Sequence, residues 1–371
     1  MSIRTEHISQ YNITYDLVRG VAALVVFVLH FKPLVLFALS GDIPPVNYFD
    51  KTVLLLAVEF FFALSGLLLG RVLLDILSKH DAPAQSLWVF VRRRLYRTLP
   101  AYYAALLVFC QVYAYAGDAY PDNLAHYFFF LQNVNGFHHE FFAVSWSLSI
   151  EEIFYLSFAL ALLPVLWLPV SPLTRLRVVI VGFIVCVAAI RFVDLLDFEY
   201  WYSDVSLAAL SRLDCIALGM LVMTYCRGRV PVWAFALAMA TILAALCYWS
   251  ISWQNITPGV MHITILNLLY LAVPLSCAVL IQYWSQTLTI RLRKIIIFLA
   301  DISYPLYVFH MVGFYCLVSF SSDLSLWLVL SVMAVCVLFS AAFHRFIEQP
   351  VMKRRPQYRD VNTKRYCEGH S

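Results

Sequence analysis

The sequence contains few charged residues and no segment polar enough to form a soluble domain. Charged residues make up 13% of its 371 residues, whereas a soluble domain carries about 25%. Hydrophobic residues account for 62% of the chain, and the mean hydropathy is +0.79. These values exclude an ordinary globular protein. They predict an integral membrane protein whose main partner is the lipid bilayer.

The nine cysteines include no CxxC pair and lie almost entirely inside apolar segments. A free cysteine in such a segment behaves as a small hydrophobic residue. We therefore expect neither a disulfide framework nor a metal site. A nucleic-acid partner is not expected. A cleavable signal peptide is not expected either, because a polar run precedes a first apolar stretch that is long enough to span the membrane.

Ten stretches have the length of about 20 apolar residues that a membrane-spanning helix needs. We predict an all-α, polytopic bundle of about ten transmembrane helices at residues 17–39, 52–77, 99–116, 143–168, 177–193, 203–225, 231–251, 260–284, 295–318 and 325–346. The predicted domains are an N-terminal segment at 1–14, a transmembrane domain at 15–350 and a basic tail at 351–371.

Acidic and basic residues alternate between successive loops. The loops after odd-numbered helices are mostly acidic, as at Asp118 and Asp122, whereas the loops after even-numbered helices are basic, as at residues 92–94. Basic loops remain on the cytoplasmic side, so we predict a multi-pass protein of the cell inner membrane with both termini in the cytoplasm. The longest outer loop, about 117–142, is expected to hold a short interfacial or re-entrant helix.

Two residues whose side chains are unfavourable in lipid, Arg19 and His30, lie inside the first apolar stretch. Eleven residues at 100° each fall about 20° short of whole turns, so both side chains share one helix face, about 16 Å apart. A charged side chain at the bilayer centre costs about 2.5–3.5 kcal/mol on insertion scales. This predicts a polar route through the bundle, with chemistry at its inner end, near His30.

The second predicted helix carries Glu59, Ser65 and Gly66. Close helix packing explains the two small residues. Glu59 needs a partner or a proton at this depth and is therefore a functional candidate.

Arginines gather at residues 91–100, where the third predicted helix opens and Pro100 suits its first turn. Arg94 and Arg97 are three residues apart, so they share a face and can clamp a phosphate group. Arg92 and Arg93 are interpreted as topology anchors.

The fourth predicted helix begins with the string SWSLSIEEIFYL and contains the adjacent acids Glu151 and Glu152. Adjacent side chains point about 100° apart, so at most one of them faces a given partner. The simplest alternative is that both carboxylates contact water at the membrane surface. Their aromatic neighbours argue against it, so we predict a functional role for these acids.

Three further segments place polar residues at membrane depth. Arg212 and Asp214 of the sixth predicted helix are interpreted as belonging to an internal ion pair that holds helices together. At the end of the tenth helix, an anchoring ion pair is the simplest interpretation of Arg345 and Glu348. The ninth helix carries a polar series, in which a proline is expected to loosen the backbone beside a cavity. This series comprises Asp301, Ser303, Tyr304, Pro305 and His310.

These segments, in this order, resemble the motifs of acyltransferase family 3, a family of integral membrane proteins. The matching motifs are Arg19 with His30, FFxxSG at 61–66, RxxR at 94–97, WSLxxE at 146–151, SYxLYxxH at 303–310 and Glu-x-Pro at 348–350. The resemblance covers about residues 15–350. The chain departs from the family at Gln349, where arginine is frequent, and it resembles the standalone members that lack an extracytoplasmic hydrolase-like domain.

The resemblance implies transfer of an acyl group, usually acetyl, from acyl-CoA as co-substrate to a hydroxyl. The acceptor is most often a carbohydrate or glycolipid, such as lipopolysaccharide, exopolysaccharide or a lipo-oligosaccharide nodulation factor. No bound cofactor is implied. A buried His30 is expected to be neutral, so it can act as general base, with Glu151 as the carboxylate that orients it.

The remaining site residues are expected to bind acyl-CoA or to lie around His30. Arginines match phosphate geometry, and those predicted to hold the phosphates of acyl-CoA are Arg19, Arg94, Arg97 and Arg345. The other functional candidates are Glu59, Glu152, Ser303, Tyr304, His310 and Glu348.

A membrane transporter or flippase of a glycan or acyl substrate is the main alternative hypothesis. Polar residues at mid-depth and a broken ninth helix also suit a substrate path. A scaffold subunit fits poorly with so many costly buried polar groups. The sequence leaves the acyl chain, the acceptor sugar and the oligomeric state open.

Overall fold

The computed structural model describes residues 12–42, 44–45, 47–79, 82–134, 141–196, 205–226, 229–252, 260–288, 292–321 and 323–358. All regular secondary structure within these ranges is helical. Most of the predicted N-terminal segment, and residues 359–371 of the predicted tail, lie outside the described residues.

Nine helices of the described chain are long and apolar enough to cross a membrane. They are α1 (Ile13–Ser40), α2 (Tyr48–Lys79), α3 (Pro83–Ala116), α5 (Ser145–Val165), α6 (Pro172–Asp194), α8 (Val232–Ser252), α9 (Val260–Thr287), α10 (Arg293–Phe320) and α11 (Leu326–Phe343). Each corresponds to one of the predicted spans, which confirms the all-α, multi-pass membrane fold. α11 continues through a π-helical turn, η4 (His344–Glu348), into α12 (Gln349–Lys353).

The sixth predicted span, 203–225, is not one long helix. Its regular part is a 3-10 turn, η3 (Leu210–Arg212), followed by α7 (Asp214–Tyr225). The 12 residues of α7 measure only about 18 Å. Irregular backbone at membrane depth is tolerated where protein buries it and satisfies its polar groups. The residues before η3 meet this condition, because Ala209 is fully buried and its N–H donates to the carbonyl of Asn133 at 2.8 Å.

Local sequence explains where α1 begins and ends. The side chain of Asn12 accepts a hydrogen bond from the N–H of Thr14 at 2.9 Å and so caps the first turn. Gly41 ends the helix with a φ of 78°, a left-handed conformation that glycine adopts without strain. Arg19 and His30 therefore lie in one uninterrupted helix, as predicted.

The third span begins earlier than predicted. α3 starts at Pro83, and Pro100 lies inside the helix rather than in its first turn. The reason is that Leu87, Phe90 and Val91 bury an apolar face at helical spacing, which extends the helix toward its N-terminus. As a result, Arg94 and Arg97 lie within the helix and not at its end.

The long loop between α3 and α5 contains a short helix, α4 (Leu124–Phe128), in the loop where a short helix was predicted. The tyrosines of α3 hold this loop, because Tyr102 donates to the carbonyl of Tyr127 at 2.6 Å and Tyr103 donates to that of Phe128 at 2.8 Å.

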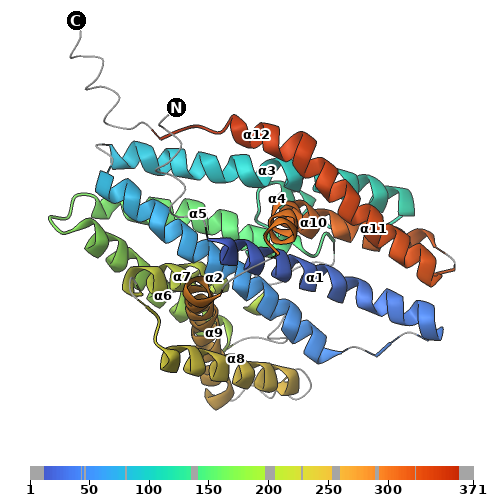
Figure 1. The fold of residues 1–371 in the computed structure, drawn as a ribbon, viewed down its shortest axis with the longest axis horizontal. Coiled ribbons are helices and arrows are strands. Elements are labelled where there is room, and N and C mark those ends of the chain that lie inside the picture. The colour runs from blue at the N-terminus through green and yellow to red at the C-terminus, as the bar shows by residue number, and fades with distance from the viewer. Residues whose placement is uncertain are drawn as a thin grey trace, which may run out of the picture.

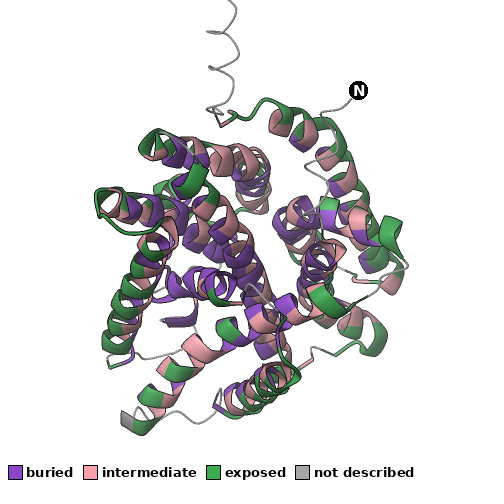
Figure 2. Cartoon of the chain, turned by 60° about the vertical axis from the view of Figure 1, so that its left-hand side comes forward, coloured by how far each residue is buried: buried purple, intermediate pink, exposed green. Residues whose placement is uncertain are grey.

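The bundle is built from pairs of helices that lie side by side, above all α1 with α10 and α2 with α7. In Figure 1, α1 and α2 run close to each other across the middle of the molecule, with α3 above them. Figure 2 shows the buried residues gathered on inward faces and the exposed ones on the outside, the pattern expected where lipid surrounds the bundle.

Two glycines allow α2 and α7 to approach each other closely. A Cβ atom at Gly66 would overlap the carbonyl oxygen of Ile216, and one at Gly219 would overlap the carbonyl oxygen of Ala63. The predicted packing role of Gly66 is confirmed.

Candidate active site

A polar cavity lies inside the bundle where α1, α2, α3, α5 and α10 meet. Its volume is about 120 Å³, room for several water molecules or the end of a flexible arm. Its polar lining residues are Arg19, Ser65, Arg94, Arg97, Thr98, Ser147, Glu151, Tyr155, Ser303, Tyr304 and Tyr307. Six of these were predicted site residues, so the tertiary structure brings much of the expected site together.

Three arginines give the cavity a positive wall. Arg94 lies over the rings of Phe90 and Tyr155, with centroid distances of 5.6 and 5.9 Å. Its Nε atom is buried and has no hydrogen-bond partner among the described residues. Arg19 is 3.8 Å from Asp16, and it also interacts electrostatically with Arg97. An anionic ligand would relieve the repulsion among these like charges and supply the acceptor that Arg94 lacks.

Glu151 is the carboxylate of this cavity. It accepts hydrogen bonds from Ser65 at 3.3 Å and from Tyr155 at 2.8 Å, and it lies within electrostatic range of Arg94 and Arg97. Ser65 therefore does more than allow close packing, which was the sequence interpretation, because its hydroxyl faces the cavity.

Several hydroxyl groups also line the cavity. Tyr307 and Ser147 are linked by a hydrogen bond of 2.7 Å, and Tyr304 donates to the carbonyl of Thr98 at 2.7 Å. Ser303 donates to the carbonyl of Ala300 at 2.7 Å, in the preceding turn of its own helix. α10 runs unbroken past its proline, so the predicted helix loosening is not needed to form the cavity.

Glu152 does not line the cavity, as expected for the neighbour of Glu151 on a helix. It is buried beside Thr98, and its Oε1 atom has no hydrogen-bond partner within the described chain.

His30 and His310 form a pair where α1 packs against α10. Nε2 of His310 is 3.2 Å from Nδ1 of His30, and the ring centroids are 5.0 Å apart. Nδ1 of His310 is 3.0 Å from the carbonyl of Leu306, and Nδ1 of His30 is 2.9 Å from that of Val26. A carbonyl only accepts, so both neutral rings carry their proton on Nδ1. This tautomer leaves Nε2 of His30 without a proton, so this nitrogen can accept one.

The sequence analysis predicted that Glu151 orients His30. In the structure, the side chain beside His30 is instead His310. The helix face that carries Arg19 and His30 packs along α10, whereas Glu151 points from α5 toward Ser65 of α2. Neither histidine lines the polar cavity. Tyr307 lies between the polar cavity and the histidine pair, because it lines the cavity and its ring centroid is 6.1 Å from that of His310.

A second hollow, which we call the basic groove, lies at the end of the bundle where α3 meets the C-terminal segment. Its volume is about 870 Å³. Its charged lining residues are Arg93, Arg97, Lys353 and Arg355, with Asp301, Glu348 and the titratable His344. Arg97 lines both hollows, so the groove and the polar cavity adjoin at this side chain. Arg93, interpreted from sequence as an anchor, is part of this groove.

Arg345 does not join the site. Glu348 accepts a hydrogen bond from His344 at 2.8 Å, so it does not form the expected ion pair with Arg345. Arg345 is exposed and lies 3.5 Å from Oε1 of Gln349. The residue next to an inward-facing His344 points about 100° away, which turns Arg345 out of the groove.

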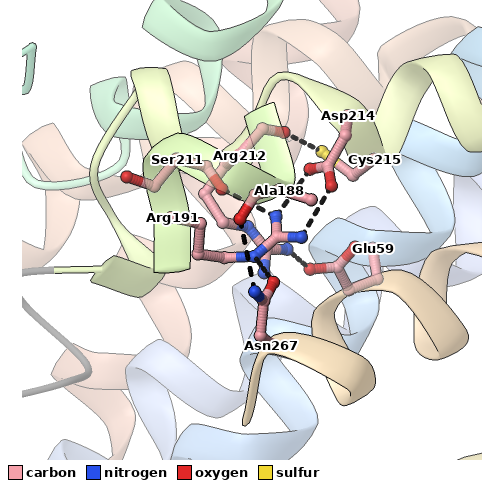
Figure 3. A network of polar contacts seen from close by, with 8 residues as sticks. All are labelled: Glu59, Ala188, Arg191, Ser211, Arg212, Asp214, Cys215 and Asn267. Atoms are coloured by element: carbon pink, nitrogen blue, oxygen red, sulfur yellow. Dashed lines mark hydrogen bonds and ion pairs between the residues drawn. The ribbon is translucent and has the colours of Figure 1, made fainter. Parts of the chain in front are cut away.

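Glu59 belongs to a separate network whose four charged side chains are fully buried (Figure 3). It forms an ion pair with Arg212, and Asp214 forms another with Arg191 at 2.8 Å. Asn267 of α9 accepts from Arg191 at 2.9 Å, so the network joins α2, α6, α7 and α9. Arg212 and Asp214 do hold helices together, as interpreted, but each does so with a partner from another helix.

Sequence reasoning missed several of these residues. Arg191 lies near the end of a predicted helix, where an arginine is usually explained by contact with the membrane surface. Tyr307 and Ser147 were visible in the SYxLYxxH and WSLxxE strings but carry no charge to single them out. No group of three or more His, Cys, Asp or Glu side chains in the described ranges is placed to hold a metal ion.

The fold and the site define a polytopic membrane protein with an internal polar cavity suited to an anionic ligand. A family model described as an acyltransferase domain matches residues 12–345, and the chain belongs to acyltransferase family 3. Searches of curated proteins and of solved structures found no match. The protein is therefore a membrane acyltransferase, which takes an acyl group from a donor. This membership favours the enzyme over the transporter hypothesis.

Proposed function

We propose that this protein is an O-acyltransferase of the cell inner membrane that moves an acyl group, in the simplest case acetyl, from acyl-CoA to a carbohydrate hydroxyl. The observation that carries the proposal is the polar cavity, in which three arginines and one glutamate surround a space of about 120 Å³. Acyl-CoA combines phosphates with a narrow thioester arm, and both parts suit such a cavity.

The arginines bind the donor in this proposal. Arg94 and Arg97 contact phosphate oxygens at the mouth of the cavity, and Arg19 adds a third cation. The buried Nε of Arg94, which lacks a partner in the described chain, is a donor for one of these oxygens. Glu151 balances the cationic wall and orients Ser65 and Tyr155, a different role from that predicted from the sequence.

His30 is the general base of the proposed reaction. Its Nε2 accepts the proton of the acceptor hydroxyl, whose oxygen forms a bond to the thioester carbonyl carbon. The carbon–sulfur bond then breaks, and the leaving sulfur takes the proton from the imidazolium to give free CoA. His310 positions the ring, because its Nε2 accepts from the Nδ1–H of His30 in both protonation states of that residue.

The proposal requires the thioester to travel from the cavity to His30. Arg19 lines the cavity, and His30 lies eleven residues farther along α1, about 16 Å at the rise of a helix. Tyr307 lines the cavity and lies beside His310, so a rotation of its side chain away from Ser147 would open a path from the cavity toward the histidine pair. The acceptor then approaches His30 from the other side of the bundle.

Purified protein in nanodiscs with labelled acetyl-CoA tests the function directly. We expect the label to move to a sugar hydroxyl, with one free CoA released for each ester formed. Comparison of surface glycans from wild-type and deletion strains by mass spectrometry would identify the acceptor. Movement of a glycan across the membrane without CoA release would contradict the proposal and support the transporter hypothesis.

A further inference from the structure

The C-terminal segment closes one side of the basic groove. Arg93 of α3 donates a hydrogen bond to the carbonyl of Pro356 at 2.7 Å, and its guanidinium lies 4.9 Å from the ring centroid of Tyr358. These two contacts dock residues 356–358 on α3. Lys353, the last residue of α12, and Arg355, beside the docked residues, both line the groove.

The groove carries an excess of positive charge. Four cations line it, against the carboxylates of Asp301 and Glu348, and Glu348 is engaged by His344. Burial, followed by the neighbouring Arg93, Arg94 and Arg97, lowers the pKa of the Arg355 guanidinium. Cations gathered this closely repel one another, and a polyanion bound among them would remove the repulsion.

The groove and the polar cavity adjoin at Arg97, so an extended molecule that passes this side chain would reach both. Such a ligand needs several phosphates at one end and a narrow, weakly polar arm at the other. The volume of about 870 Å³ in the groove is far larger than a single phosphate requires. It suits a nucleotide, whose base has room beside the phosphates.

We propose that the basic groove binds the phosphorylated nucleotide end of acyl-CoA, and that Lys353 and Arg355 of the C-terminal segment contact its phosphates together with Arg93. This inference rests on the proposed function and assigns the donor nucleotide to residues beyond the predicted transmembrane domain. The phosphate of an anionic lipid headgroup shares this chemistry, so the test separates the two sources.

The test measures equilibrium binding of CoA to the full-length protein in nanodiscs of neutral lipid. We expect Arg355→Gln and Lys353→Gln each to raise the Kd for CoA about tenfold, the loss expected for a charge-assisted hydrogen bond. Arg354→Gln is the matched control, because Arg354 is an exposed neighbour that does not line the groove. Arg355→Lys keeps the charge and should recover part of the affinity. Acyl-phosphopantetheine, which lacks the nucleotide, should bind equally to all four variants and to wild type.

Equal losses in Arg355→Gln and Arg354→Gln would overturn the proposal, as would unchanged affinity in both groove variants. Weaker binding to anionic vesicles with unchanged CoA affinity would assign the groove to lipid headgroups and also overturn it. The failure of the proposed function is distinguishable from these results, because binding is measured without turnover. A protein that binds CoA through the groove and transfers nothing contradicts only the catalytic proposal.

Discussion

The Nε2 atom of His310 lies 3.2 Å from the Nδ1 atom of His30, across the interface between α10 and α1. Each Nδ1 atom also faces a backbone carbonyl four residues earlier in its own helix. The hydrogen-bond pattern therefore assigns the protons of both rings, and Nε2 of His30 remains as the acceptor. A half-buried imidazole with an unprotonated nitrogen and a fixed orientation is what a general base requires.

The first prediction concerns the base itself. His30→Ala should lower the rate of acyl transfer about 10²–10⁴-fold, the usual contribution of a general base, while the protein still inserts in the membrane. The measurement is label transfer from acetyl-CoA by purified protein. His262→Ala is the control, because His262 lies on α9 and bonds to Tyr248 away from the site. Near-normal activity of His30→Ala would refute the mechanism.

The second prediction separates His310 from His30. In His310→Leu, Nδ1 of His30 keeps only the carbonyl of Val26 as acceptor and the ring loses its contact with α10, so kcat should fall while the KM for acyl-CoA stays near the wild-type value. His310→Gln should retain more activity, since its amide oxygen can accept near the position of Nε2. Steady-state kinetics of both variants make the comparison. If glutamine rescues no better than leucine, His310 does not act by positioning His30.

The third prediction concerns the buried ion pair between Glu59 and Arg212. Glu59→Gln leaves a buried guanidinium without its counter-charge, which should destabilise the protein by about 3–5 kcal/mol. Thermal unfolding in detergent measures the loss. Replacing both residues, as Glu59→Leu with Arg212→Met, should restore much of the stability.

The control for this experiment lies on the same helix. Asp75 pairs with Lys79 at 3.0 Å, but both side chains are more than half exposed. Asp75→Asn should therefore change stability by less than about 1 kcal/mol. Equal destabilisation by the Asp75 and Glu59 variants would show that the buried pair has no special importance.

The fourth prediction tests the close approach of α2 and α7. A methyl group at Gly66 would overlap a backbone carbonyl, which cannot move away as a side chain would. Gly66→Ala should therefore destabilise the protein by about 1–3 kcal/mol. Gly182→Ala on α6 should be tolerated, because an added Cβ there meets no atom within 4 Å. A similar melting temperature for the two variants would contradict this account of the interface.

The spacing of polar residues within single helices predicted much of the site. Arg94 and Arg97 share a face because they are three residues apart, and the structure places both in the polar cavity. Only one of the adjacent acids Glu151 and Glu152 reaches the cavity, as helix geometry requires. These relationships depend on local geometry, which a sequence contains in full.

Contacts between side chains of different helices could not be predicted as well from the sequence. Glu151 was expected beside His30, yet the sequence contains no information on how far α5 is rotated relative to α1. The same limit applied to Arg212, whose partner Glu59 lies on a helix far away in sequence. The sixth span was predicted as a regular helix because its composition is apolar, and the buried contacts that break it come from other segments.

The sequence by itself determined that the chain is a multi-pass helical membrane protein, because composition and the length of apolar stretches decide whether a segment is stable in lipid. Its ordered motifs also determined the acyltransferase family. Only the tertiary structure decided that His310 is the partner of His30, that Arg97 lines both the cavity and the basic groove, and that Arg345 stays outside. Such contacts depend on the rotation and depth of each helix against its neighbours, which packing sets across the whole bundle.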